Sequence, residues 1–130
     1  MRKTSKVLLT LVLVGIFVLG CATFKSNVYK SLYSTGTLYD VAMKSAADLK
    51  AQGKITDAHV SELMKIANLY YVAYQASVDA FETYLKTDSA ADKDKLAVAL
   101  ADVAGKLSKI LDYVNRIRSA NGLKPIGGGV

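Results

Sequence analysis

The stretch LAVALADVAGKLSKILDYVNRI, residues Leu96–Ile117, holds the most regular pattern in the 130-residue chain and decides its fold class. Large apolar residues recur there at alternating steps of four and three positions, which places them along one side of an α-helix. Asp92 before the stretch and Arg118 after it match the charges that the two ends of a helix dipole favour. The sequence therefore predicts a helix over residues 90–120. The expected buried side carries Leu96, Leu100, Val103, Leu107, Ile110, Val114 and Ile117.

Two earlier segments, residues 28–52 and 57–86, show similar spacing and predict two more helices. Gly53 suits the left-handed position that follows the last turn of a helix. Thr56 suits the N-cap of the next helix, and Asp57 places a negative charge at its positive end. The expected buried side of the first helix carries Val28, Leu32, Thr35, Tyr39, Ala42, Ala46 and Leu49. That of the second carries Val60, Leu63, Ala67, Tyr70, Tyr74, Val78, Phe81 and Leu85.

The three predicted helices are long, and the loops between them are short. Loops of about three or four residues force neighbouring helices to run antiparallel. We therefore expect an all-α protein, an up-down-up three-helix bundle over residues 28–122, followed by a flexible tail at residues 123–130. The alternative keeps the same helices but packs their apolar sides between chains, as an oligomeric coiled coil.

The start of the chain has the organisation of a signal peptide. Arg2, Lys3 and Lys6 precede an uncharged apolar run from Val7 to Gly20. A helix of that length reaches about 21 Å, which is less than the roughly 30 Å hydrocarbon core of a bilayer. Positive charge, a short apolar run and small residues at its end predict a signal peptide over residues 1–20 that is cleaved, rather than a membrane span.

The end of this run resembles the lipobox of bacterial lipoprotein precursors: Val18-Leu19-Gly20-Cys21 has an aliphatic residue three positions before a Cys and a small residue directly before it. The resemblance implies a diacylglyceryl group on Cys21, cleavage before it, and acylation of the new amino terminus. Residues 21–27 are then a lipidated Cys and a short tether. In Gram-negative members of this family, an Asp directly after the Cys tends to retain the lipoprotein in the inner membrane. Ala22 occupies that position here, so the resemblance implies the periplasmic leaflet of the outer membrane if the host is Gram-negative.

Two other interpretations of Cys21 remain open. Gly20-Cys21-Ala22 also has the small-x-small form of an ordinary signal-peptidase site, which would release a secreted protein. A free Cys21 thiol would instead pair between chains.

Composition argues against several function classes. The net charge is +6, and without Arg2, Lys3 and Lys6 it is 14 − 11 = +3. Acidic and basic residues are interspersed, so we expect no nucleic-acid partner. One Cys and one His cannot build a tetrahedral zinc site, so we expect no metal or other cofactor. His59 is interpreted as a solvated residue in the first turn of its helix.

The sequence offers no set of residues for catalysis, and we predict that the protein is not an enzyme. It has no glycine-rich phosphate loop after a strand and no nucleophile elbow. The acidic pairs Asp92/Asp94 and Asp79/Glu82 are expected on helix surfaces as solvated charges. Four acid–base pairs at i,i+4 spacing are expected to support the helices, namely Asp40–Lys44, Glu82–Lys86, Asp102–Lys106 and Asp112–Arg116. A basic cluster near the last helix end comprises Lys106, Lys109, Arg116, Arg118 and Lys124. The dipole explains its position, and contact with anionic lipid or peptidoglycan-linked polymers is the alternative.

Tyrosine is the unusual residue of this chain, with eight Tyr against three Phe and no Trp. Tyr39, Tyr70 and Tyr74 fall on the predicted buried sides, with hydroxyls that reach the boundary of the core. Tyr33 and Tyr71 fall off those sides. Because exposed tyrosines are enriched at protein interfaces, Tyr33 and Tyr71 are our candidates for a partner-binding surface.

The part after Cys21 resembles short helical lipoproteins of unknown function from bacterial genomes and prophages. The likeness lies in Cys21–Phe24, Ala46–Leu49, Gln52–Thr56 and Ala73–Ala80. We therefore expect a non-enzymatic, lipid-anchored cell-envelope protein that acts as an interaction or scaffolding module, with an envelope protein as partner and a homo-oligomer as an option. One alternative is a prophage-encoded lipoprotein for superinfection exclusion or lysis. Another is a carrier of a small apolar ligand.

Overall fold

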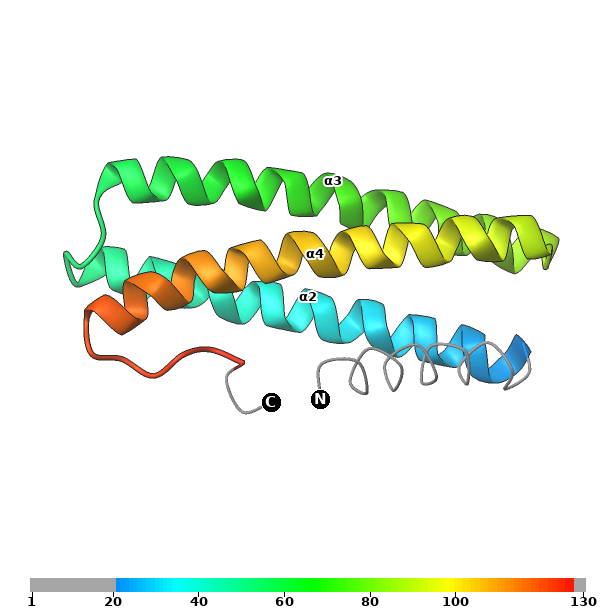
Figure 1. The fold of residues 1–130 in the computed structure, drawn as a ribbon, viewed down its shortest axis with the longest axis horizontal. Helices are drawn as coiled ribbons and strands as arrows, with labels where there is room; N and C mark the ends of the chain where they lie inside the picture. The colour runs from blue at the N-terminus through cyan, green and yellow to red at the C-terminus, as the bar shows by residue number, and fades with distance from the viewer. Residues whose placement is uncertain (1–20, 128–130) are drawn as a thin grey trace, which may run out of the picture. The chain divides into compact units, whose positions relative to one another are not determined.

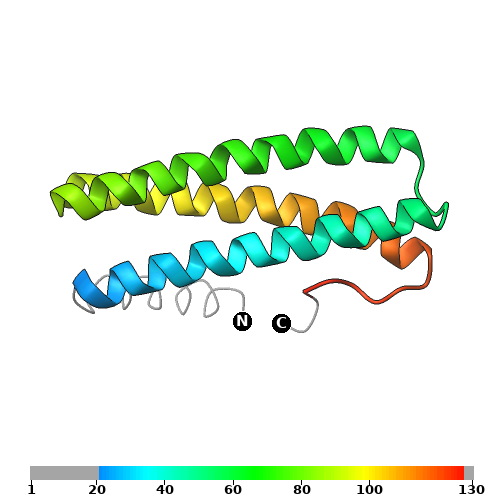
Figure 2. The same cartoon turned by 180° about the vertical axis from the view of Figure 1, so that it is seen from behind.

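The computed structural model describes residues 21–127, and these form three α-helices joined by short turns: α2 (Cys21–Ala51), α3 (Asp57–Thr87) and α4 (Ala90–Ala120). From Leu32 onward the three helices lie side by side, and each runs in the opposite direction to the one before it (Figures 1 and 2). No strand occurs in the described residues. The predicted all-α, up-down-up bundle is therefore confirmed. The predicted signal peptide lies outside the described residues.

The ends of α2 and α4 are each followed by a glycine in the left-handed region, as predicted for Gly53. Gly53 has φ +69° and Gly122 has φ +72°, a region in which side chains are strained. After α2, the Lys54 amide donates to the Leu49 carbonyl, at 2.9 Å. After α4, the Leu123 amide donates an equivalent hydrogen bond to the Arg118 carbonyl, at 2.9 Å. Both ends are Schellman motifs, which satisfy carbonyls that the helix itself leaves open.

The turn between α3 and α4 is held by a cluster of hydroxyl groups around one carboxylate. Ser89 is the N-cap of α4, and its side chain accepts a hydrogen bond from the Asp92 amide at 3.1 Å. The Thr87 and Ser89 hydroxyls both donate to Asp92 Oδ2, at 2.5 and 2.9 Å. These two bonds lower the pKa of Asp92 below its ordinary value. Thr87, Ser89 and Asp92 thus form one hydrogen-bonded cluster at the start of α4.

The core of the bundle is formed by small residues on α2, mixed residues on α3 and large aliphatic residues on α4. Its buried members are Ala42, Ala46, Leu63, Tyr70, Ala73, Val103, Leu107, Ile110 and Val114. The backbones of α3 and α4 approach each other more closely than either approaches α2. Helix α2 contacts α3 through aromatic side chains: the Tyr39 ring on α2 stacks on the Tyr70 ring on α3, with ring centroids 4.6 Å apart.

Most of the residues on the predicted buried sides of the first and third helices are buried, and Thr35, Tyr39, Leu100 and Ile117 are partly exposed. The predicted side of the second helix needs a correction. In α3, Leu63, Ala67 and Tyr70 are buried as expected. Further along, the buried residues are Ala73, Ser77 and Tyr84, whereas Leu85 is 47% exposed and Tyr74, Val78 and Phe81 are partly exposed. Because small Ala73 and Ser77 side chains permit close approach, the helix turns this narrower side inward.

The predicted tether and the predicted flexible tail both need a correction. Residues 21–27, expected to be a tether, are the first residues of α2, which begins at Cys21. No Gly or Pro interrupts this segment, so nothing in it breaks the helix. Phe24 and Val28 are buried and extend the i,i+4 repeat toward the start of this helix.

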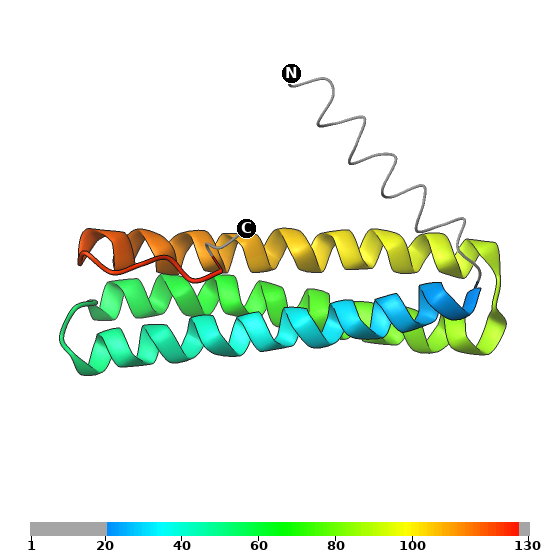
Figure 3. The ribbon, with the colours of Figure 1, turned by 90° about the horizontal axis from the view of Figure 1, so that it is seen from below.

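The expected flexible tail is folded back along α4 as far as it is described (Figure 3). The Asn115 side chain donates to the Ile126 carbonyl at 3.1 Å and accepts from the Ile126 amide at 2.7 Å. Ile126 also packs against the core cluster. Arg118 Nε donates to the Lys124 carbonyl at 2.7 Å. A chain segment with satisfied backbone groups and a packed apolar side chain is ordered, despite its glycines.

Candidate functional site

Tyr33 and Tyr71, the two candidates for a partner surface, both point to solvent. Tyr33 on α2 is 70% exposed, and Tyr71 on α3 is 60% exposed. The Tyr74 hydroxyl donates a hydrogen bond to the Leu32 carbonyl, at 3.5 Å, and so joins α3 to α2. Tyr33 directly follows Leu32, and Tyr71 lies one turn before Tyr74. The structure thus places the two tyrosines on neighbouring helices, close to the same interhelical contact.

Besides Tyr71, three large apolar side chains on the solvent side of α3 are exposed, Met64, Leu69 and Val72, and we call these four residues the α3 outer patch. These three side chains are 47%, 53% and 66% exposed. Leu69, Tyr71 and Val72 lie in the segment Ile66–Val78, IANLYYVAYQASV, which contains no charged residue, whereas Met64 lies beside the exposed Lys65. An uncharged apolar surface of this kind marks interaction sites more often than single exposed apolar residues do.

Met64, Leu69 and Val72 were not among the predicted partner-surface residues, although the sequence carries a signal for them. All three fall off the Leu63–Ala67–Tyr70 side of the helix, as Tyr71 does. An apolar residue off the buried side of a helix is as informative as an exposed tyrosine when several share an uncharged segment.

The tyrosines that were expected in the core form a stack between α2 and α3. Tyr39 and Tyr70 are nearly parallel, at 10°, and the Tyr70 and Tyr74 centroids are 5.9 Å apart. Tyr70 is 3% exposed, and its hydroxyl has no hydrogen-bond partner among the protein atoms. Burial raises the pKa of Tyr70 above its ordinary value. The expectation that these hydroxyls reach the boundary of the core is therefore wrong for Tyr70.

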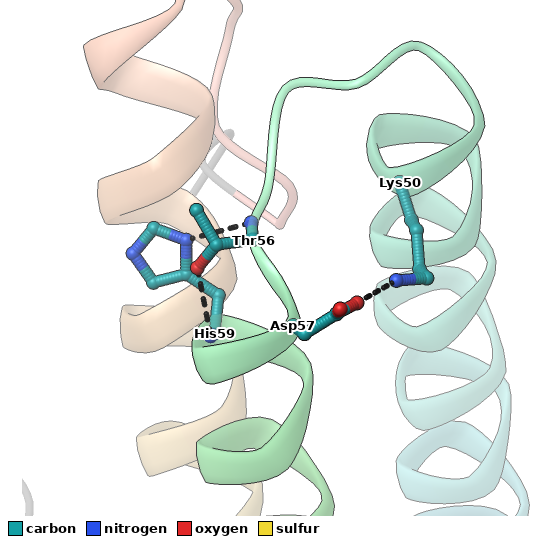
Figure 4. A network of polar contacts seen from close by, with 4 residues as sticks. All are labelled: Lys50, Thr56, Asp57 and His59. Carbon is teal, nitrogen blue, oxygen red and sulfur yellow. Dashed lines mark hydrogen bonds and ion pairs between the residues drawn. The ribbon is translucent and has the colours of Figure 1, made fainter.

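The start of α3 contains a hydrogen-bond network around the single histidine (Figure 4). The His59 amide donates to Thr56 Oγ1, and the Thr56 amide donates to His59 Nδ1, both at 3.2 Å. This is a capping box in which His replaces the usual Glu. His59 is therefore a half-buried capping residue rather than a freely solvated one. On the other side of the helix start, Asp57 forms an ion pair with Lys50, at 2.5 Å.

The predicted surface charges are only partly paired. In the described part of the chain, Asp102–Lys106 forms at 3.6 Å, whereas Asp40–Lys44, Glu82–Lys86 and Asp112–Arg116 form no ion pair. In the basic cluster, Arg118 also has a structural role, because its guanidinium donates to the Ser45 hydroxyl at 2.7 Å and so joins α4 to α2.

Among residues 21–127, no three His, Cys, Asp or Glu side chains lie close enough together to hold a metal ion. Within the same range, none of the helices has the length and apolar character needed to cross a bilayer. Cys21, the predicted lipidation site, is the first residue of α2. Comparison with known proteins gave no match to a family model, to a curated protein or to a solved structure.

Proposed function

We propose that the protein is a non-enzymatic module of the cell envelope, anchored to a membrane by lipid on Cys21, that binds a protein partner through the α3 outer patch. The α3 outer patch is the observation that carries the proposal. It offers four large apolar side chains on one rigid helix, and three of them, Leu69, Tyr71 and Val72, lie in the uncharged segment Ile66–Val78. Tyr71 supplies the kind of side chain that contributes most at protein interfaces.

The anchor is supported by the position of the single Cys directly after the apolar run Val7–Gly20. Each buried methylene of an acyl chain contributes about 0.8 kcal/mol, and two or more chains anchor a protein stably. We place the anchored protein in the outer membrane, facing the periplasm, if the host is Gram-negative, because Ala22 follows the Cys.

Radioactive palmitate and mass spectrometry of the processed amino terminus test the anchor. We expect the chain to incorporate the label and to begin at an acylated Cys21. Cys21→Ala should abolish labelling, while Cys21-containing control variants such as Val98→Ala keep it. An unlabelled chain, or one that begins at another residue, contradicts the anchor but leaves the α3 outer patch to be tested separately.

In-cell cross-linking tests the partner surface. A photo-reactive amino acid at Tyr71 should capture a specific protein, whereas the same amino acid at Val98 should not. Val98 lies on α4, is 72% exposed, and so is a matched apolar control. The captured protein, once purified, should bind the chain and should lose binding to Val72→Ser. Capture of the same proteins at both positions would argue against a specific surface.

The exposure of the two candidate tyrosines can be checked by thermal unfolding. We expect Tyr33→Ala and Tyr71→Ala to change the melting temperature by only a few degrees, because most of each side chain is already in solvent. A sharp fall in melting temperature would assign these residues to the core and remove them from the proposed surface.

A further inference from the structure

The end of the bundle where the α2–α3 loop meets the last turns of α4 contains a shallow hollow of about 350 Å³, which the proposed function does not use. Lys54 comes from the loop, His59 from the first turn of α3, and Tyr113 and Arg116 from α4. The volume lies within the range of about 300–1,000 Å³ that is typical of small-molecule sites.

The capping box holds the His59 ring by Nδ1 and leaves Nε2 as its hydrogen-bond donor. Its Nδ1 accepts the Thr56 amide in the capping box, so in the neutral ring the hydrogen is on Nε2. The Tyr113 hydroxyl donates to the His59 carbonyl at 3.4 Å, and the two rings meet edge to face, with centroids 6.3 Å apart. The α3 and α4 sides of the hollow are therefore fixed against each other.

The charges of the hollow are all positive. Lys54 and Arg116 line it, no acidic residue does, and neither cation forms an ion pair in the described residues. Asp57, the acid closest in sequence to His59, is paired with Lys50 and points away from the His59 ring (Figure 4).

Three further charged residues, Glu62, Lys109 and Asp112, line a neighbouring hollow that shares Tyr113 and Arg116. Asp112 is four residues before Arg116 on α4, yet the described residues show no ion pair between them, so Arg116 lines both hollows as an unpaired cation.

We propose that the hollow of Lys54, His59 and Arg116 binds a small organic anion in which a carboxylate or phosphate is attached to an apolar group. The lining is mostly apolar, with Ile117, Ala120 and the Tyr113 ring available to the apolar group. Arg116 offers two parallel N–H donors to the anion, and charge-assisted bonds of this kind are the strong ones. Lys54 and His59 Nε2 add donors at the rim.

The test is a titration of the ¹⁵N-labelled 130-residue chain, kept soluble in a non-ionic detergent, with phenyl phosphate. We expect saturable shifts of the Lys54, His59 and Ile117 amide signals. Benzyl alcohol lacks the negative charge, so it should bind more weakly than phenyl phosphate. Glycerophosphate, which is a phospholipid headgroup without its acyl chains, lacks the apolar group and should also bind more weakly. Arg116→Ala should weaken phenyl phosphate binding about tenfold, as expected for the loss of a charge-assisted hydrogen bond.

Lys109→Ala is the matched control, because it removes a positive charge from the same helix but not from this hollow. It should change the affinity by no more than about twofold, as expected for a screened surface charge. Equal weakening by Arg116→Ala and Lys109→Ala would show general charge attraction and overturn the site. Shifts that do not saturate, or equal binding of glycerophosphate, would also overturn it.

Discussion

Tyr70→Phe is expected to stabilise the protein, although it removes a polar group from a tightly packed position. The ring is 3% exposed and stacks on Tyr39, and phenylalanine keeps both the ring and its contacts. What disappears is a buried hydroxyl without a hydrogen-bond partner. A buried polar group left unsatisfied costs about 1–3 kcal/mol, because it has lost its hydrogen bonds to water.

We therefore expect the free energy of unfolding to rise by about 1 kcal/mol or more, since the lost contacts of one oxygen atom offset part of this gain. For a domain of 60–100 residues, 1 kcal/mol corresponds to a melting temperature higher by about 4–8 °C. Thermal unfolding followed by circular dichroism, with the chain in non-ionic detergent, measures this shift.

Tyr74→Phe is the matched control, one turn further along α3. Its hydroxyl donates to the Leu32 carbonyl, so its removal should lower the free energy of unfolding by about 0.5–1.5 kcal/mol. The two substitutions delete the same atom and are expected to have opposite signs. If Tyr70→Phe destabilises the protein as much as Tyr74→Phe does, the Tyr70 hydroxyl is satisfied and the reasoning fails.

The same hydroxyl predicts a dependence on alkaline pH. Burial is the main cause of the raised pKa of Tyr70, and Tyr74, Tyr39 and Asp40 add smaller effects. In the unfolded chain Tyr70 ionises near pH 10, whereas in the folded protein it remains neutral at that pH. The free energy of unfolding should therefore fall as the pH rises above 10. The free energy of unfolding of Tyr70→Phe should fall less steeply with pH. If the two proteins give parallel curves of unfolding free energy against pH, the fall does not come from Tyr70.

Three further predictions concern the tail, acid stability and association. Asn115→Ala should lower the free energy of unfolding by about 1–3 kcal/mol, because it leaves the two backbone groups of Ile126 without partners; retained hydrogen-exchange protection of the Ile126 amide would contradict this. Asp92, whose folded pKa is lowered by Thr87 and Ser89, stabilises the protein above its unfolded pKa, and this contribution is lost as the pH falls through the folded pKa. Asp92→Asn should therefore flatten the acid side of the stability curve, and an unchanged slope would refute it. Analytical ultracentrifugation should give a monomer once bound detergent is accounted for, and a stable trimer would favour the interchain coiled coil instead.

Of the α3 outer patch only Tyr71 was predicted, although solvent exposure follows from helix periodicity and Met64, Leu69 and Val72 also fall off the buried side. Tyr33 and Tyr71 fall off the apolar sides of their helices, and both are exposed. The role of His59 was also within reach, since it lies three positions after the predicted N-cap Thr56, where a capping box places its second residue. By contrast, the approach of His59 to Arg116 joins residues 57 positions apart in the chain, and no local pattern encodes it.

For the described residues 21–127, the sequence by itself determined the three helices, the Thr56 cap and the buried side of α4, because 3.6-residue periodicity and capping chemistry are local properties of the chain. Only the tertiary structure decided which side of α3 turns inward after Tyr70, since close packing depends on the neighbours that Ala73 and Ser77 admit. It also decided that Ile126 packs on the core, because a short segment after a helix becomes ordered only when a distant side chain, here Asn115, satisfies its backbone.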